Sequence, residues 1–111
     1  HTLVRNAQFN LQQSQLQYQQ TASIVQSNLL KAWKNLNAAS EAMKLEEDNI
    51  LIARENVAIA LERFRIGSSN NLEVLLAQRS FADATARLAT ARYDAKAAET
   101  ELKRLNGELV K

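Results

Sequence analysis

Apolar residues recur along the first half of the chain in alternating steps of three and four. This heptad spacing places them on one side of a helix and indicates a coiled coil. One position of the stripe is charged, Glu46, which is unfavourable unless the side chain faces solvent or pairs with a base. The stripe comprises Tyr18, Ala22, Val25, Leu29, Ala32, Leu36, Ala39, Met43, Ile50, Ala53, Val57, Ala60 and Phe64. Upstream it weakens, because glutamines alternate with Val4 and Leu11.

The second half of the chain carries the same pattern without a charged interruption. Its members are Val74, Ala77, Phe81, Ala84, Leu88, Ala91, Ala95, Ala98, Leu102, Leu105 and Leu109. The mean step is slightly shorter than one turn of a straight helix, so burying the stripe requires a left-handed supercoil. We therefore predict two helices that wind around each other.

The residues between the two stripes carry the signals of a tight turn. Gly67 suits the left-handed conformation that closes a helix at its C′ position. Asn70, followed three residues later by Glu73, matches a capping box that begins a second helix. Gly107 follows two basic residues and gives a second stop signal.

The predicted fold is all-α, a long antiparallel coiled-coil hairpin that forms a single domain. Its helices span about 2–65 and about 71–106, with the turn at about 66–70. At 1.5 Å per residue the helices are about 95 and 54 Å long, so the arms are unequal. About 25 to 30 N-terminal residues would then lack a partner within the chain, and a helix needs packing to be stable in water.

The N-terminal arm is also unusual in composition, because residues 6–30 contain no charged side chain. Two interpretations stay open. The stretch is either a low-complexity polar helix that frays, or a wall that faces a water-filled lumen or lies near a membrane.

A second apolar stripe runs beside the first. Two adjacent stripes favour contacts with two neighbours, as in a bundle or a closed ring of helices. The alternative is that the alanines act only as helix formers on a half-exposed face. The members are Ala38, Leu45, Ile52, Ile59 and Ile66 in the first helix, and Leu75, Ala82, Ala86, Ala89 and Tyr93 in the second.

Composition argues against catalysis and cofactors. The 111 residues include no Cys, and the one His is His1. We therefore expect no catalytic residue, no metal site and no cofactor. The 14 basic and 12 acidic residues are interspersed, which disfavours nucleic-acid binding, and no apolar stretch is long enough to cross a membrane. Because the chain begins with His1 rather than Met, we expect it to be a segment of a longer protein.

Five short motifs support a family assignment: AREN at 53–56, FRIG at 64–67, LEVLLAQ at 72–78, ARY at 91–93 and LKRLNG at 102–107. On these motifs the chain resembles the outer-membrane efflux protein (TolC-like) family. The resemblance covers nearly the whole chain and is carried by motifs from Ile52 to Gly107. Upstream of Leu29 it rests on the apolar pattern.

The resemblance implies a passive export duct rather than an enzyme. It places the parent protein, a homotrimer, in the outer membrane of a Gram-negative bacterium. This segment would be the periplasmic helical hairpin of the second repeat, part of an α-barrel. A periplasmic adaptor protein would bind the hairpin, and an inner-membrane pump would act through that adaptor. We also expect the isolated segment to self-associate.

The resemblance also implies two functional sites. Glu73 corresponds to an acidic position at the channel entrance, although its capping role alone would explain it. Leu76 and Ser69 stand where TolC-like channels carry charged gate residues, so that gate is not present here as a whole. The adaptor-binding tip would comprise Arg65, Ile66, Gly67 and Ser68.

Two other functions are compatible with a helical hairpin. An adaptor protein has a hairpin of its own, but with arms of similar length and an Arg-Leu pair at the tip, whereas here the tip reads Arg-Ile-Gly-Ser. A coiled-coil scaffold without a transport role is the second. A parent gene without a signal peptide would favour the scaffold.

Overall fold

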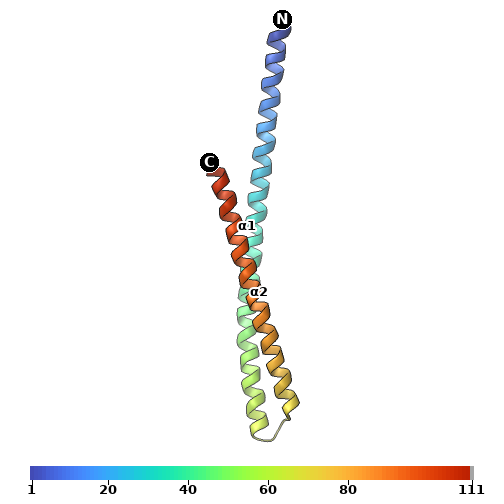
Figure 1. The fold of residues 1–111 in the computed structure, drawn as a ribbon, viewed down its shortest axis with the longest axis vertical. Coiled ribbons are helices and arrows are strands. Elements are labelled where there is room, and N and C mark those ends of the chain that lie inside the picture. Colours follow the sequence, from blue (N-terminus) through green and yellow to red (C-terminus); the bar gives the residue numbers. More distant parts are fainter. Residues whose placement is uncertain (111) are drawn as a thin grey trace.

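The computed structural model describes residues 1–110, and side chains as far as Glu108. It contains two helices, α1 (Thr2–Arg65) and α2 (Asn71–Val110), which run antiparallel as a hairpin 98 Å long (Figure 1). Its other two dimensions are 21 and 13 Å, so the molecule is a rod. The predicted all-α hairpin is confirmed.

The two heptad stripes face each other along the rod. Every member of the second stripe up to Leu105 is buried or half-buried, and so is every member of the first from Val25 to Ala60. The side chain of Leu109 lies outside the described residues. The most buried positions are dominated by alanine, with Ala84 at 1% and Ala60 at 3% exposure, so the helix backbones approach closely. The helices cross in the view of Figure 1, as the supercoil requires.

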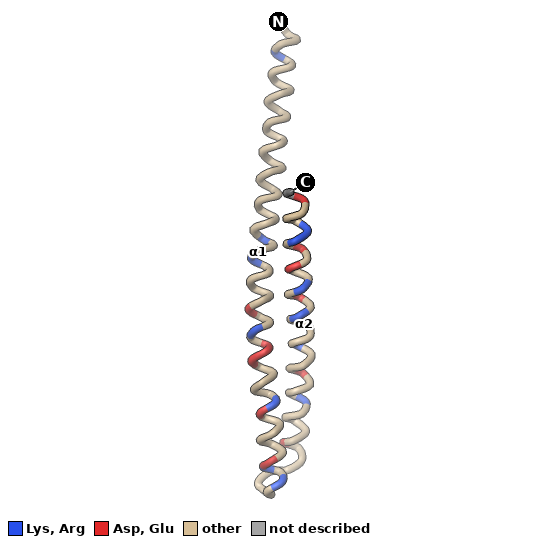
Figure 2. Tube along the Cα trace, turned by 90° about the vertical axis from the view of Figure 1, so that its left-hand side faces the viewer, with Lys and Arg blue, Asp and Glu red and all other residues tan. Residues whose placement is uncertain are grey.

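The arms are unequal, as the lengths predict. α1 has 64 residues and α2 has 40, so α2 passes the middle of α1 and ends well short of its N-terminus (Figure 1). All residues of α1 before Val25 are exposed, including the stripe members Tyr18 and Ala22. Figure 2 shows this arm almost without charge, in contrast to the paired region below it.

The end of α2 differs from the prediction. The helix continues through Gly107 to Val110 instead of ending near residue 106. A glycine closes a helix only when it adopts the left-handed conformation, and Gly67 is the glycine with a positive φ among the described residues. Gly107 remains helical, and the i,i+4 ion pair of Arg104 with Glu108 (2.6 Å) spans it.

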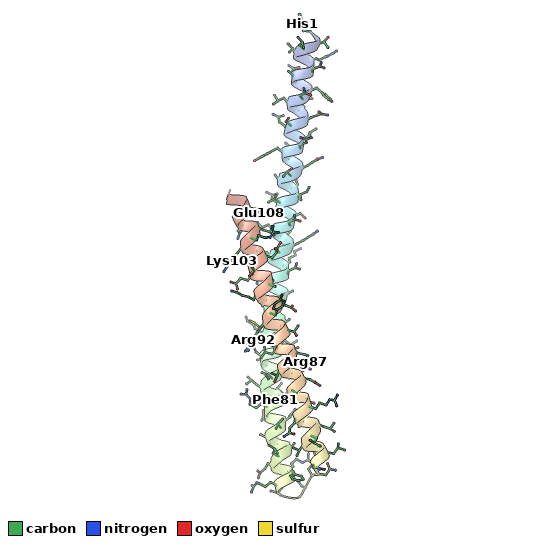
Figure 3. All side chains as sticks on the ribbon, viewed as in Figure 1. His1, Phe81, Arg87, Arg92, Lys103 and Glu108 are labelled. Carbon is green, nitrogen blue, oxygen red and sulfur yellow. The ribbon has the colours of Figure 1, made fainter. Side chains whose placement is uncertain are left out.

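Two polar contacts join the helices midway along the hairpin. Arg87 Nε donates a hydrogen bond to Oε2 of Glu46 at 3.2 Å, which gives the charged stripe position the basic partner it needs. The guanidinium of Arg54 lies 5.9 Å from the ring centroid of Phe81, a cation–π contact. Arg87 and Phe81 are labelled on α2 in Figure 3. These contacts help to fix the register of one helix against the other.

The second apolar stripe has no partner among the side chains that the structure describes. On α1 its members Leu45, Ile52 and Ile59 are about half exposed, and on α2 Leu75 and Tyr93 are more than half exposed. Figure 3 shows side chains projecting into solvent along both helices. The hairpin thus buries one of its two stripes.

Candidate docking site at the hairpin tip

The backbone after α1 forms the Schellman motif that Gly67 predicts. The N–H of Ser68 donates to the carbonyl of Arg63 at 2.9 Å, and the N–H of Gly67 donates to the carbonyl of Phe64 at 3.1 Å. These two bonds define the motif. Gly67 has a φ of 82°, within the left-handed region. Its expected role as the C′ residue is confirmed.

α2 begins with a side-chain cap, as the sequence predicts. Asn70 Oδ1 accepts a hydrogen bond from the backbone N–H of Glu73 at 3.1 Å. The carboxylate of Glu73 takes different partners from those of a capping box. Arg63 Nη1 donates to its Oε1 at 2.7 Å, and the hydroxyl of Ser69 donates to its Oε2. A guanidinium is a stronger partner for a carboxylate than the backbone N–H of Asn70, because the bond is charge-assisted on both sides.

A second ion pair lies on the last turn of α1. Arg65 donates from Nε and Nη2 to the two carboxylate oxygens of Glu62, at 3.0 and 2.6 Å. These hydrogen bonds lower the pKa of Glu62 and raise the pKa of Arg65. Because both side chains are exposed, the pair orients Arg65 at the tip and adds little to stability.

The tip presents apolar side chains to solvent. Ile66 is 64% exposed, and Phe64 and Leu72 flank it at 49% and 58%. The layer nearest the turn in which both helices bury a side chain is formed by Ala60 and Val74. Beyond this layer the turn is held by hydrogen bonds and ion pairs rather than by an apolar core.

The structure brings the four predicted tip residues together within one turn. Arg65, Ile66, Gly67 and Ser68 are all exposed at one end of the rod. Glu73 lies on the first turn of α2, and Arg63 connects it to the end of α1. Sequence reasoning missed the pairing of Arg63 and Ser69 with Glu73, because a contact across a turn depends on the turn's conformation. The sequence signal that could have indicated this pairing is the short separation of Arg63, Ser69 and Glu73 around the predicted turn.

The rest of the described chain offers no competing chemical site. Within residues 1–110 no cluster of three or more His, Cys, Asp or Glu side chains could hold a metal ion. A groove of about 570 Å³ lies between the helices, and it is lined mainly by alanines with Glu46, Arg87, Thr90 and Asp94. Neither helix, over its described length, is both long and apolar enough to span a membrane.

A comparison with protein families decides the assignment. The sequence profile described as outer membrane efflux protein matches residues 2–108. The chain belongs to the outer membrane efflux protein family. Neither a curated protein nor a solved structure matches it.

The family assignment confirms the resemblance drawn from the motifs. Outer membrane efflux proteins are transport channels and not a family of enzymes, so this hairpin is a component of an efflux channel. The match is to the channel family, which favours that interpretation over an adaptor hairpin or a scaffold. Members act in general as trimers with adaptors and pumps.

Proposed function

We propose that this outer membrane efflux protein segment is the periplasmic hairpin of the second repeat of a TolC-like channel. In the trimeric parent it would form part of the export duct and bind a periplasmic adaptor at its tip. An inner-membrane pump would supply the energy through the adaptor, and these residues would perform no chemistry. The observation that carries the proposal is the tip itself, a turn closed by backbone hydrogen bonds, with exposed apolar side chains, at the end of a 98 Å rod.

The proposed adaptor-binding surface comprises Arg65, Ile66, Gly67 and Ser68. Ile66 supplies an exposed apolar side chain, and its burial against an adaptor would favour binding. Gly67 keeps the turn narrow and has no heavy atom within 4 Å of the place its Cβ would occupy. An approaching adaptor could therefore contact the backbone of the turn directly.

We assign Glu73 to the channel entrance. It lies on the first turn of α2, next to the turn that would face the adaptor. Its side chain is 41% exposed, so it contributes to the surface at this end of the rod. The position also fits the acidic residue that the family resemblance implies.

The trimeric parent would cover the second apolar stripe. Leu45, Ile52 and Ile59 of α1 and Leu75 of α2 are exposed in the hairpin alone, and each continues a heptad repeat. Two stripes per hairpin suit a ring in which each hairpin packs against a helix on either side. The exposed N-terminal arm would be covered by other helices of the parent in the same way.

Site-directed cross-linking in the full-length protein tests adaptor binding. These 111 residues contain no Cys, so Ser68→Cys introduces the one thiol of this segment, in a parent from which any other Cys has been removed. Ser80→Cys is a matched control on α2. We expect a thiol-reactive cross-linker to join position 68, and not position 80, to the adaptor expressed with the channel. Equal cross-linking at the two positions, or none at position 68, would contradict docking at the tip.

A further inference from the structure

Three side chains bridge the turn between the helices, namely Arg63, Ser69 and Glu73, and we call them the tip clasp. Arg63 comes from the last turn of α1, Glu73 from the first turn of α2, and Ser69 from the connection. The two oxygens of the Glu73 carboxylate bind separate members of the clasp, Oε1 to Arg63 at 2.7 Å and Oε2 to Ser69.

We propose that the tip clasp positions the docking turn, and that Glu73 acts through Arg63 rather than as a free carboxylate at the channel entrance. This inference deepens the proposed docking function and rests on it. Arg63 and Ser69 are thereby positioning residues for the turn that carries Ile66, Gly67 and Ser68.

Arg63 connects the docking turn to α2 through both its backbone and its side chain. Its carbonyl accepts hydrogen bonds from the N–H of Ser68 at 2.9 Å and from the hydroxyl of Ser68 at 3.2 Å. Its guanidinium binds Glu73. The Glu73 backbone is held in turn by Asn70. The connection is thus held by hydrogen bonds at both of its ends. Ser68 binds Arg63, and Arg63 in turn binds Glu73 of α2.

Besides the Schellman hydrogen bonds and the Asn70 cap, little else at the tip could hold this conformation. Phe64, Ile66 and Leu72 are about half exposed or more, so no apolar core surrounds the turn. Packing begins at Ala60 and Val74, which are 3% and 9% exposed. The polar contacts of the clasp therefore carry a larger share of local order here than a surface ion pair does on the side of a well-packed helix.

The clasp also changes what Glu73 offers to a passing solute. A carboxylate that binds a guanidinium at 2.7 Å has its charge compensated at close range. The hydroxyl of Ser69 engages its other oxygen. With the clasp closed, the entrance position therefore presents a neutral pair and not an isolated negative charge.

A double-mutant cycle in the full-length channel tests the clasp. We would measure amide hydrogen exchange in residues 66–72 for Arg63→Gln, Glu73→Gln and the double variant. Each single variant should raise the exchange rate of this segment about two- to fivefold, the range of one exposed ion pair. The double variant should match a single variant and not the product of the two, because both remove the same contact. Arg79→Gln, an exposed charge change elsewhere on α2, should leave the segment's exchange unchanged.

Adaptor cross-linking from Ser68→Cys, measured in the same variants, tests the link to docking. We expect the cross-linking yield to fall in each single variant, because the docking turn is less often held in its closed conformation. The clasp would be contradicted if the exchange rate is unchanged in both single variants. It would also be contradicted if the rate increase in the double variant equals the product of the two single increases. Faster exchange with unchanged cross-linking would overturn the positioning role while leaving docking intact. If Ser68→Cys alone gives no cross-link, the docking proposal and the positioning role both fail, and the exchange data judge the clasp separately.

Discussion

At Gly67 the chain reverses direction through a backbone conformation that most residues avoid. Its φ of 82° lies in the left-handed region, and nothing lies within 4 Å of the place of its missing Cβ. A side chain at this position would meet free space, so the constraint comes from the backbone and not from packing. A substitution at Gly67 therefore tests backbone strain alone, without the steric clash that often accompanies it.

We expect Gly67→Leu to lower the free energy of unfolding of the hairpin by about 1–2 kcal/mol, the cost of a left-handed L-residue. Gly67→Asn should lose distinctly less, because Asn tolerates this conformation. Urea denaturation followed by circular dichroism would give both values. An equal loss in the two variants would show that the left-handed backbone is not the cause.

At the scale of the helices, the charged position in the first stripe is the clearest departure from an apolar seam. The Glu46 side chain is 18% exposed and depends on Arg87 of the other helix for its partner. Arg87 is 54% exposed, so its charge stays solvated when Glu46 is replaced, whereas Glu46 would be left part-buried and uncompensated without Arg87. The two members should therefore respond to mutation in opposite directions.

Glu46→Leu should raise the free energy of unfolding of the hairpin by roughly 1 kcal/mol, because Leu completes the apolar stripe. Its thermal midpoint should rise accordingly. Arg87→Met should lower the midpoint, since Glu46 then faces the seam without a base. Thermal unfolding by circular dichroism measures both shifts. If Glu46→Leu proves destabilising, the ion pair itself contributes more to stability than an apolar contact would.

The stability of α2 should depend on pH through its exposed ion pairs. A hydrogen bond from Lys103 lowers the pKa of Glu99, and hydrogen bonds from Arg104 lower the pKa of Glu101. A carboxylate with a lowered folded-state pKa stabilises the helix above its unfolded pKa of about 4.3, and this contribution is lost as the pH falls through the folded value. As the pH is lowered below about 4.3, we expect the thermal midpoint of the hairpin to decrease. The decrease should be less steep in Glu101→Gln. Parallel pH curves for the two proteins would contradict this assignment.

The helices and the faces that they bury were predictable because heptad spacing reports directly which side chains face a partner. The stripe members from Val25 to Ala60 and from Val74 to Leu105 are the residues that become covered. The end of α2 was not predictable in the same way, because a glycine signals a stop only if the chain turns there, and Gly107 stays helical. The clasp contact between Arg63 and Glu73, ten positions apart, required the geometry of the turn.

On the scale of the whole molecule, stability is distributed unevenly along the rod. The N-terminal arm of α1 has its stripe exposed and no helix beside it, whereas the remainder is packed against α2. A helix without tertiary packing opens readily in water. In the isolated chain the arm should therefore behave differently from the paired region, although the two belong to one continuous helix.

Amide hydrogen exchange of the 111-residue chain measures this difference. We expect residues 2–24 to exchange faster than residues 50–105, because opening the arm breaks no contact with α2. Full coverage by a second copy would slow the arm in a concentration-dependent way, so exchange should be followed over a dilution series. Uniform protection at every concentration would contradict the expected order.

The seven-residue repeat, which both helices keep through the paired region with Glu46 as its charged position, restricts how the length of this rod can change. Each residue of an α-helix advances the side-chain direction by about 100°, so a single deletion within the paired region would turn the rest of the stripe away from its partner. Removing seven residues from both helices at facing positions would preserve the alignment and shorten the rod by about 10 Å. Viable insertions and deletions in the paired region should therefore occur as matched heptads, which makes the reach of the tip adjustable only in fixed steps.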